Sequence, residues 1–178
     1  MSIHDLFVKR RSIRRYTGDQ ISADDVKLIM EAGLLAPSSK NQRSCRFVAV
    51  DDPDTIAKLA ECKPRGANPI QNCALAIVIG SDSTLSEPWI EDASIAATMM
   101  QLQITALDLG SCWIQVRGRE HSEGESAEDY IRRLLGIPEH VRILCILSIG
   151  HPDEERPLQN VDKLCWDHVH IERWNPEQ

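Results

Sequence analysis

Residues 91–109 read EDASIAATMMQLQITALDL, and this stretch decides the fold. Ala, Ile, Met and Leu recur on nearly every side of the helix that these residues predict, so the helix has no broad polar face. A helix that is apolar all round must be buried. We expect a central helix that packs on a sheet on one side and on a second subunit on the other, and that ends at Gly110, where a C-terminal cap belongs.

The segments on either side of this helix predict a sheet and further helices. Residues 74–79 form an apolar run without alternation, which is typical of a central strand covered on both faces. Pairs of Ser and Asp three positions apart have the spacing of helix N-terminal caps. The expected strands are residues 46–50, 74–79, 112–116 and 141–149, and the expected helices follow Ser2, Ser22 and Ser126 and include residues 56–60. This order of elements predicts an α+β or α/β sandwich.

The end of the chain, residues 151–178, is charged, contains proline and is only weakly periodic. Such a segment cannot form a core of its own and must lie along another surface. Neither a linker nor an internal repeat is visible, so we expect a single domain over residues 1–178.

The composition narrows the class of protein. A formal net charge of −7 argues against a general role in binding nucleic acid or anionic membranes. The six cysteines form no C-x-x-C pair, so we expect reduced thiols, and no metal site or disulfide framework. No window reaches the roughly 18 apolar residues of a membrane span. We therefore expect a cytoplasmic protein.

A basic cluster stands out in this acidic chain. Five of the twenty Lys and Arg residues fall within seven positions. One interpretation is a solvated helix end, where cations interact favourably with the helix dipole. The other is a phosphate clamp, because guanidinium groups chelate phosphate oxygens and a hydroxyl from Ser12 adds a donor. The five residues are Lys9, Arg10, Arg11, Arg14 and Arg15.

The motif Arg-Arg-Ser-Ile-Arg-Arg-Tyr at residues 10–16 resembles the opening of the nitroreductase family, which grips the phosphate and ribityl chain of FMN. Ala-Pro-Ser-Ser-Lys-Asn-Gln at 36–42 is similar to the family's connection between the second helix and the first strand. Leu-Gly-Ser-Cys-Trp-Ile at 109–114 is similar to its strand beneath the flavin ring. The segment from Gly150 to Trp174 resembles its C-terminal ending, so the resemblance covers essentially the whole chain.

The resemblance implies an α+β three-layer sandwich with a central, mostly antiparallel sheet flanked by helices, assembled as a homodimer whose 151–178 tail wraps the partner subunit. It also implies one FMN per site, NADH or NADPH as the electron donor, and hydride transfer through flavin N5 to a small acceptor such as a nitroaromatic or a quinone, with ping-pong kinetics. No side chain is expected to act as a catalytic nucleophile or base, because the flavin carries the chemistry.

The resemblance also implies which residues contact the cofactor. The phosphate and ribityl chain are expected to bind Arg10, Arg11, Ser12, Arg14 and Lys163. The flavin held mainly by the partner subunit is expected to contact Pro37, Ser38, Ser39 and Asn41. Asn68 is a candidate for the pyrimidine edge of the ring. The strand expected to face the ring supplies Trp113, Ile114, Gln115 and Val116, with a backbone N–H near Gln115 or Val116 directed at N5.

Two departures from the family pattern bear on the substrate. Gln115-Val116 stands where many relatives have glycine, so the pocket floor is expected to be bulkier. The polar loop 117–126 has no aromatic lid residue.

Two alternative functions stay open. One is a flavin-dependent dehalogenase or a flavin-destroying relative of the same fold. The other is a non-enzymatic FMN-binding sensor or carrier.

Overall fold

An antiparallel sheet forms the middle layer of the computed structural model, which describes residues 2–122 and 124–174. The strand order is β1-β2-β4-β3, and all three neighbouring pairs are antiparallel. The sheet is built from β1 (Cys45–Val50), β2 (Leu75–Asp82), β3 (Gly110–Gln115) and β4 (Val141–Gly150). β2 and β4 are therefore the inner strands, as the apolar run at 74–79 predicts, and β3 is an edge strand.

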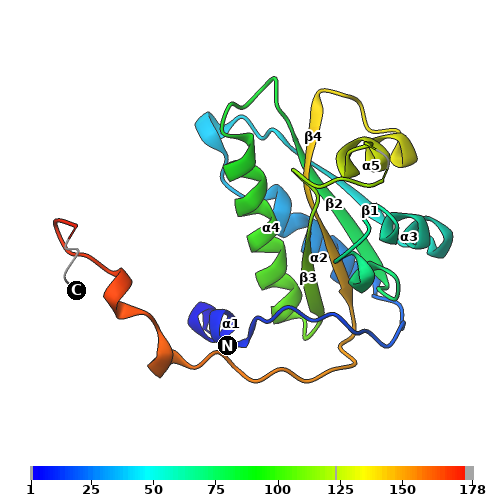
Figure 1. Cartoon of the computed structure of the whole chain (residues 1–178). Coiled ribbons are helices and arrows are strands. Elements are labelled where there is room, and N and C mark those ends of the chain that lie inside the picture. Colours follow the sequence, from blue (N-terminus) through cyan, green and yellow to red (C-terminus); the bar gives the residue numbers. More distant parts are fainter. Residues whose placement is uncertain (1, 123, 175–178) are drawn as a thin grey trace.

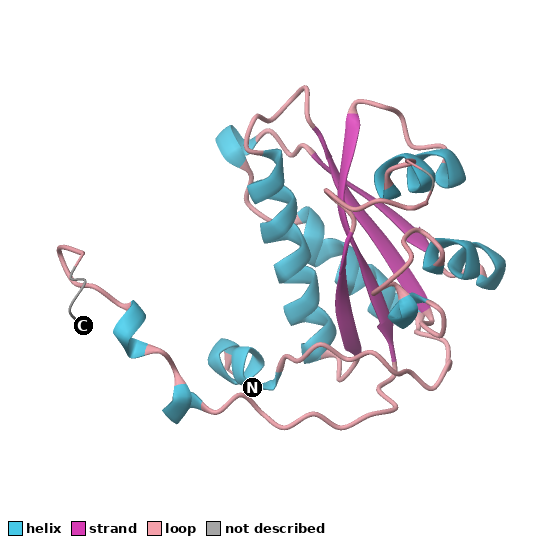
Figure 2. Cartoon of the chain, in the orientation of Figure 1, coloured by secondary structure: helices cyan, strands magenta, loops and turns pink. Residues whose placement is uncertain are grey.

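Helices cover both faces of this sheet (Figures 1 and 2). Successive side chains of a strand point to opposite faces, so β2 contributes to two separate cores. Ile77 and Ile79 face the helices α2 and α4, whereas Ala76 and Val78 face α3 and α5. The helices are α1 (Ile3–Lys9), α2 (Ala23–Leu34), α3 (Pro53–Ala60), α4 (Trp89–Ala106) and α5 (Ala127–Leu135), with short 3-10 turns at Ser39–Asn41, Asn68–Ile70, Val161–Lys163 and Trp166–His168. The three-layer α+β sandwich is confirmed.

Local sequence signals explain where these helices begin. The Ser2, Ser22 and Ser126 hydroxyl groups each accept a hydrogen bond from the backbone N–H three residues later, as the Ser and Asp spacing predicts. None of the helices in residues 2–122 and 124–174 combines the length and the apolar character needed to cross a membrane.

The central helix α4 packs one face on the sheet, as expected, while Glu91, Ile95, Thr98 and Ala106 are exposed, and its predicted end was wrong. It starts at Trp89 and stops at Ala106, and the left-handed residue after it is Asp108, with φ of 59°. Asp tolerates this conformation better than most residues with a side chain, because its short polar group can bond locally. Gly110 instead begins β3 and pairs with Gly150 of β4.

The tail after Gly150 passes the ends of the strands and α1 and then leaves the body of the chain (Figure 1). Its beginning is held, because the Gln159 N–H donates to the Val8 carbonyl at 2.9 Å. Farther along, large apolar side chains are exposed, including Trp166 at 70%, Ile171 at 84% and Trp174 at 78%. Residues 175–178 of the predicted tail lie outside the described residues.

Candidate functional site

The arginine-rich segment, residues 10–16, crosses the end of the sheet where β3 starts and β4 finishes. Its backbone joins the sheet at Ile13, whose N–H donates to the Ser111 carbonyl at 2.9 Å. A Cβ atom on Gly110 would lie 2.8 Å from the Cβ of Ile13, and one on Gly150 would lie 2.9 Å from the Cβ of Tyr16. The two paired glycines thus leave the space in which this segment lies.

Tyr16 fastens the segment to β4. Its buried hydroxyl donates to a carbonyl oxygen, with Ile13 O at 2.6 Å and Ser148 O at 3.0 Å, and lies 2.9 Å from the Ser148 hydroxyl. Burial raises the pKa of Tyr16 well above its ordinary value, so the hydroxyl stays protonated as a donor. The base of the arginine-rich segment is therefore rigidly placed.

The guanidinium groups of this segment project beside the first part of the tail. Arg11 donates to the Pro157 carbonyl, and Arg14 donates to the Ser12 carbonyl at 3.5 Å. The Glu154 carboxylate accepts the Arg14 backbone N–H at 2.5 Å, and this bond lowers the pKa of Glu154. The backbone is thus held by Glu154, while the exposed Arg14 and half-buried Arg11 side chains keep donors for a ligand.

Arg11 and Lys163, both expected at the phosphate, line one cavity of about 590 Å³ between α1 and the tail. Phe7 and Leu158 supply part of its apolar wall. The structure thus brings together two of the predicted phosphate ligands that lie far apart in the sequence.

The end of β3 supplies a second part of the site. The Ile114 and Val116 side chains are buried in the core, so only their backbone groups could meet a ligand. The Val116 N–H donates to the Leu144 carbonyl at 3.1 Å. In an antiparallel pair the N–H groups of neighbouring residues point in opposite directions. The N–H of Gln115, the residue before Val116, therefore faces the open edge of the sheet. Of the two predicted N5 donors, Gln115 is the one left at the edge.

The side chains at this edge are ordered by hydrogen bonds. The Trp113 indole N–H donates to the Gln115 side-chain oxygen at 3.0 Å, and the Gln115 amide donates to the Arg117 carbonyl at 3.0 Å. Lys63 donates from Nζ to the Gln115 carbonyl at 2.9 Å. Lys63 is thereby fixed next to the expected flavin-facing strand.

Lys63, Arg65 and Arg119 form a cationic cavity that the sequence reasoning missed. The cavity has about 550 Å³ and is lined by Lys63, Pro64, Arg65, Gln115, Gly118, Arg119 and Glu120. Burial, together with the positive charge of Arg119, lowers the pKa of Lys63. The only sequence signal was the basic pair Lys63 and Arg65 directly before the Gly66-Ala67-Asn68 loop. The predicted pyrimidine ligand Asn68 is exposed and does not line this cavity.

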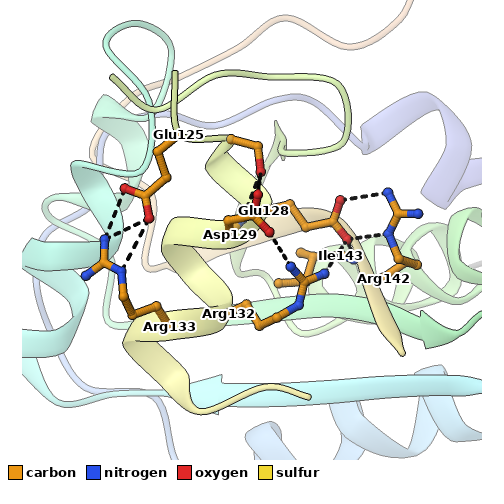
Figure 3. A network of polar contacts seen from close by, with 8 residues as sticks. Glu125, Glu128, Asp129, Arg132, Arg133, Arg142 and Ile143 are labelled. Carbon is orange, nitrogen blue, oxygen red and sulfur yellow. Dashed lines mark hydrogen bonds and ion pairs between the residues drawn. The ribbon is translucent and has the colours of Figure 1, made fainter. Parts of the chain in front are cut away.

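Residues 117–122 and 124–126 of the polar loop are held against α5 and keep Arg119 at this cavity. His121 stacks on the Tyr130 ring with centroids 4.1 Å apart, and the Ala127 N–H donates to the Arg119 carbonyl at 2.9 Å. Arg133 of α5 binds Glu125 of the loop at 2.9 Å (Figure 3). Gly118, Arg119 and Glu120 of the loop thus form one wall of the cavity.

The predicted residues at 37–41 lie on a separate loop, at the start of β1. Pro37 and Asn41 are exposed, and the Ser38 hydroxyl accepts the Arg43 N–H at 2.8 Å. Within the described part of the chain, no hydrogen bond joins these residues to the arginine-rich segment. The two groups are therefore not hydrogen-bonded to one another in the described part of the chain.

The donor set fits FMN. The arginine-rich segment offers guanidinium forks and Lys163 an ammonium group for a terminal phosphate, and the β3 edge offers the Gln115 backbone N–H beside a cavity lined by three cations and Glu120. Such groups stabilise negative charge by preorganised electrostatics.

Comparison with known proteins identifies the relatives of this chain. The profile of the Nitroreductase family matches residues 7–82 and 63–151. A protein of Archaeoglobus fulgidus named "Putative NADH dehydrogenase/NAD(P)H nitroreductase" is 35% identical over 170 residues, which cover 93% of this chain and 94% of the relative. An FMN-dependent nitroreductase from Clostridium difficile R20291 superposes with a TM-score of 0.93 at 42% identity, covering 95% of this chain and 98% of that one. The chain belongs to the nitroreductase family.

Proposed function

We propose that this protein is an FMN-dependent oxidoreductase that uses NADH or NADPH to reduce a small acceptor such as a nitroaromatic or a quinone. The observation that carries the proposal is the rigid placement of residues 10–16 across the sheet end next to the open β3 edge at Gln115. The 42% identical Clostridium difficile relative, which is named as FMN-dependent, supports the choice of cofactor.

The cofactor phosphate and ribityl chain would bind at the arginine-rich segment. Arg10, Arg11 and Arg14 supply charge-assisted donors, and Ser12 adds a hydroxyl. Lys163 reaches the same place from the tail, since it lines the Arg11 cavity. These residues bind a terminal phosphate, which favours FMN over a dinucleotide.

The flavin ring would lie along the β3 edge. Bound FMN supplies the hydride-transfer chemistry, and the protein supplies its orientation and electrostatic environment. The Gln115 N–H would donate to N5, and Lys63, held by the Gln115 carbonyl, would place positive charge nearby. Arg119 and Arg65 would favour acceptors that carry a negative charge.

We infer that the working unit is a homodimer with two FMN sites, built from one domain of residues 1–178 per chain. Two features support this inference: the exposed apolar side chains of the tail, and the exposed Ile95 on the face of α4 that points away from the sheet core. The tail of one subunit would wrap the other, and Pro37, Ser38, Ser39 and Asn41 would contact the flavin held by the partner's arginines. The six unpaired cysteines suit a reducing compartment such as the cytoplasm.

The test is to purify the protein, release any bound cofactor by heat and identify it by chromatography, and then to follow NADH and NADPH oxidation with an added nitroaromatic. We expect FMN and acceptor-dependent oxidation. Release of FAD, or a protein that gains no flavin absorbance on titration with FMN, would overturn the proposal. A protein that binds FMN without oxidising either donor would instead be a carrier.

A further inference from the structure

Asp92, in the first turn of α4, is a buried carboxylate that joins three parts of the chain. Asp92 is only 3% exposed. One oxygen, Oδ1, accepts the Ser39 backbone N–H at 2.8 Å. The other, Oδ2, accepts the hydroxyl groups of Ser44 at 3.2 Å and of Ser86 at 2.7 Å. Both ends of the loop between Ser39 and Ser44 are thus tied to α4 through one side chain.

That loop has a backbone that needs external support. Lys40, Asn41 and Arg43 all have positive φ, at 50°, 54° and 50°. Left-handed backbone is unfavourable for residues with a side chain, and three such residues within four positions persist only when the surroundings hold them. Hydrogen bonds inside the loop, such as the Asn41 N–H to the Ser38 carbonyl at 3.0 Å, shape the turn but do not fix it to the body.

An ionised carboxylate suits this position for two reasons. It accepts hydrogen bonds and donates none, so it satisfies three donors that converge on it. It also lies at the N-terminal end of an 18-residue helix, where the helix dipole favours negative charge. An amide of the same size could still accept the Ser39 N–H, but it carries no charge, and the Ser44 and Ser86 hydroxyls would have to rotate to accept its N–H₂ group. The three hydrogen bonds that Asp92 accepts, and not only its volume, therefore tie the loop to α4.

We propose that Asp92 is a positioning residue for the cofactor site: it fixes the 39–44 loop in the left-handed conformation that presents Ser39 and Asn41 to FMN. This inference rests on the proposed function, in which these two residues contact the flavin. Because the Ser39 N–H is already taken by Asp92, Ser39 offers its hydroxyl to a ligand. Asp92 itself is buried beneath the loop and acts only through it.

The test compares Asp92→Asn with Ser86→Ala, which removes a hydrogen bond to the same carboxylate without touching the loop. The first readout is hydrogen exchange of a peptide spanning residues 38–44 in the protein without FMN. We expect faster exchange there in Asp92→Asn, with unchanged exchange in β2, and no change in Ser86→Ala. The second readout is FMN affinity, which should fall about tenfold in Asp92→Asn, the loss expected when a charge-assisted bond is removed.

Ser44→Ala covers the case in which Asp92→Asn does not fold, because it leaves two donors on the carboxylate. It removes one neutral donor to Asp92 and the acceptor of the Ser81 hydroxyl. It should speed loop exchange and weaken FMN binding in the same direction, by a smaller factor. A folded Asp92→Asn variant with wild-type loop exchange and wild-type FMN affinity would overturn the proposal. If the wild-type protein bound no FMN, the proposed function would fail, and loop exchange would still decide whether Asp92 holds the loop.

Discussion

Glu128 at the start of α5 accepts two hydrogen bonds from Arg142 of β4, at 2.7 and 3.0 Å (Figure 3). The same carboxylate accepts the Ile143 N–H at 2.9 Å and a bond from Arg132 at 3.0 Å. Burial alone would raise the pKa of Glu128, but these donors outweigh it and leave the pKa below its ordinary value of 4.5. The carboxylate thus fastens α5, and with it the loop that carries Arg119, to the sheet.

Glu128→Gln should therefore lower the free energy of unfolding by about 2 kcal/mol at neutral pH, less than for a fully buried pair because the Arg142 side chain is 45% exposed. A lowered pKa in the folded state contributes stability above pH 4.5 that is lost as pH falls through the folded pKa. The difference between wild type and variant in urea unfolding should shrink below that pH.

Glu31→Gln is the matched control for this change, since the Glu31 to Lys27 pair at 3.8 Å lies on the surface of α2. Its cost should stay below about 0.5 kcal/mol. Equal losses for the two variants, or a difference for Glu128→Gln that does not change with pH, would rule out the assigned role of Glu128.

Gly150→Ala should displace the arginine-rich segment, because the added Cβ would lie 2.9 Å from the Cβ of Tyr16. We expect a loss of about 1–3 kcal/mol in stability and a weaker affinity for FMN. Gly80→Ala is the control: its Cβ would lie 2.4 Å from the Arg142 carbonyl at the opposite end of the sheet. That variant should lose stability but keep FMN affinity in its folded fraction, and an equal loss of affinity in both would contradict the prediction.

Replacing Arg11 or Arg14 with Ala should weaken FMN binding about tenfold or more while leaving the fold intact, since each change removes a charged donor from a solvent-facing site. Fluorescence titration of the protein with FMN measures this. Arg15→Ala, in the same segment, serves as the control and should bind FMN nearly as wild type does. Wild-type affinity in both Arg11→Ala and Arg14→Ala would mean that the cluster is only a solvated helix end.

Mixed dimers test whether each site is shared between subunits. A subunit with Arg11→Ala and Arg14→Ala, mixed with one carrying Ser39→Ala and Asn41→Ala, should restore about one good FMN site per mixed dimer, because the intact arginines and the intact loop then meet at one interface. Equilibrium titration of the separated heterodimer gives the number of sites. Mixed dimers no better than either parent, or a stable monomer with stoichiometric FMN, would place each site within one chain.

The sequence predicted the layers of this fold because they depend on local patterns. The unbroken apolar run at residues 74–79 and the helix at 91–109 each show their burial in their own composition. The end of α4 was wrong because two residues, Asp108 and Gly110, could both serve as a stop, and the requirement for Gly110 comes from Ile13, which is remote in sequence.

The site was predicted less completely, because part of it exists only in three dimensions. Lys63 follows α3 and Arg119 follows β3. The two residues share a cavity because the segment after α3 and the segment after β3 meet there. The role of Asp92 also depends on contacts with Ser39 and Ser44, which are remote in sequence, and with Ser86, which lies six residues before it. No local pattern in the sequence marks either feature, whereas the cluster at residues 9–15 is visible from its density of charge.

The most direct test of the central claim is to follow the visible absorbance of the FMN-loaded protein without oxygen through two separate additions. NADH or NADPH should bleach the flavin absorbance, and a nitroaromatic or quinone added after removal of the donor should restore it, as expected if donor and acceptor react in turn at one site. A protein that binds FMN but shows no bleaching with either nicotinamide, or no recovery with any acceptor of these classes, would contradict the account.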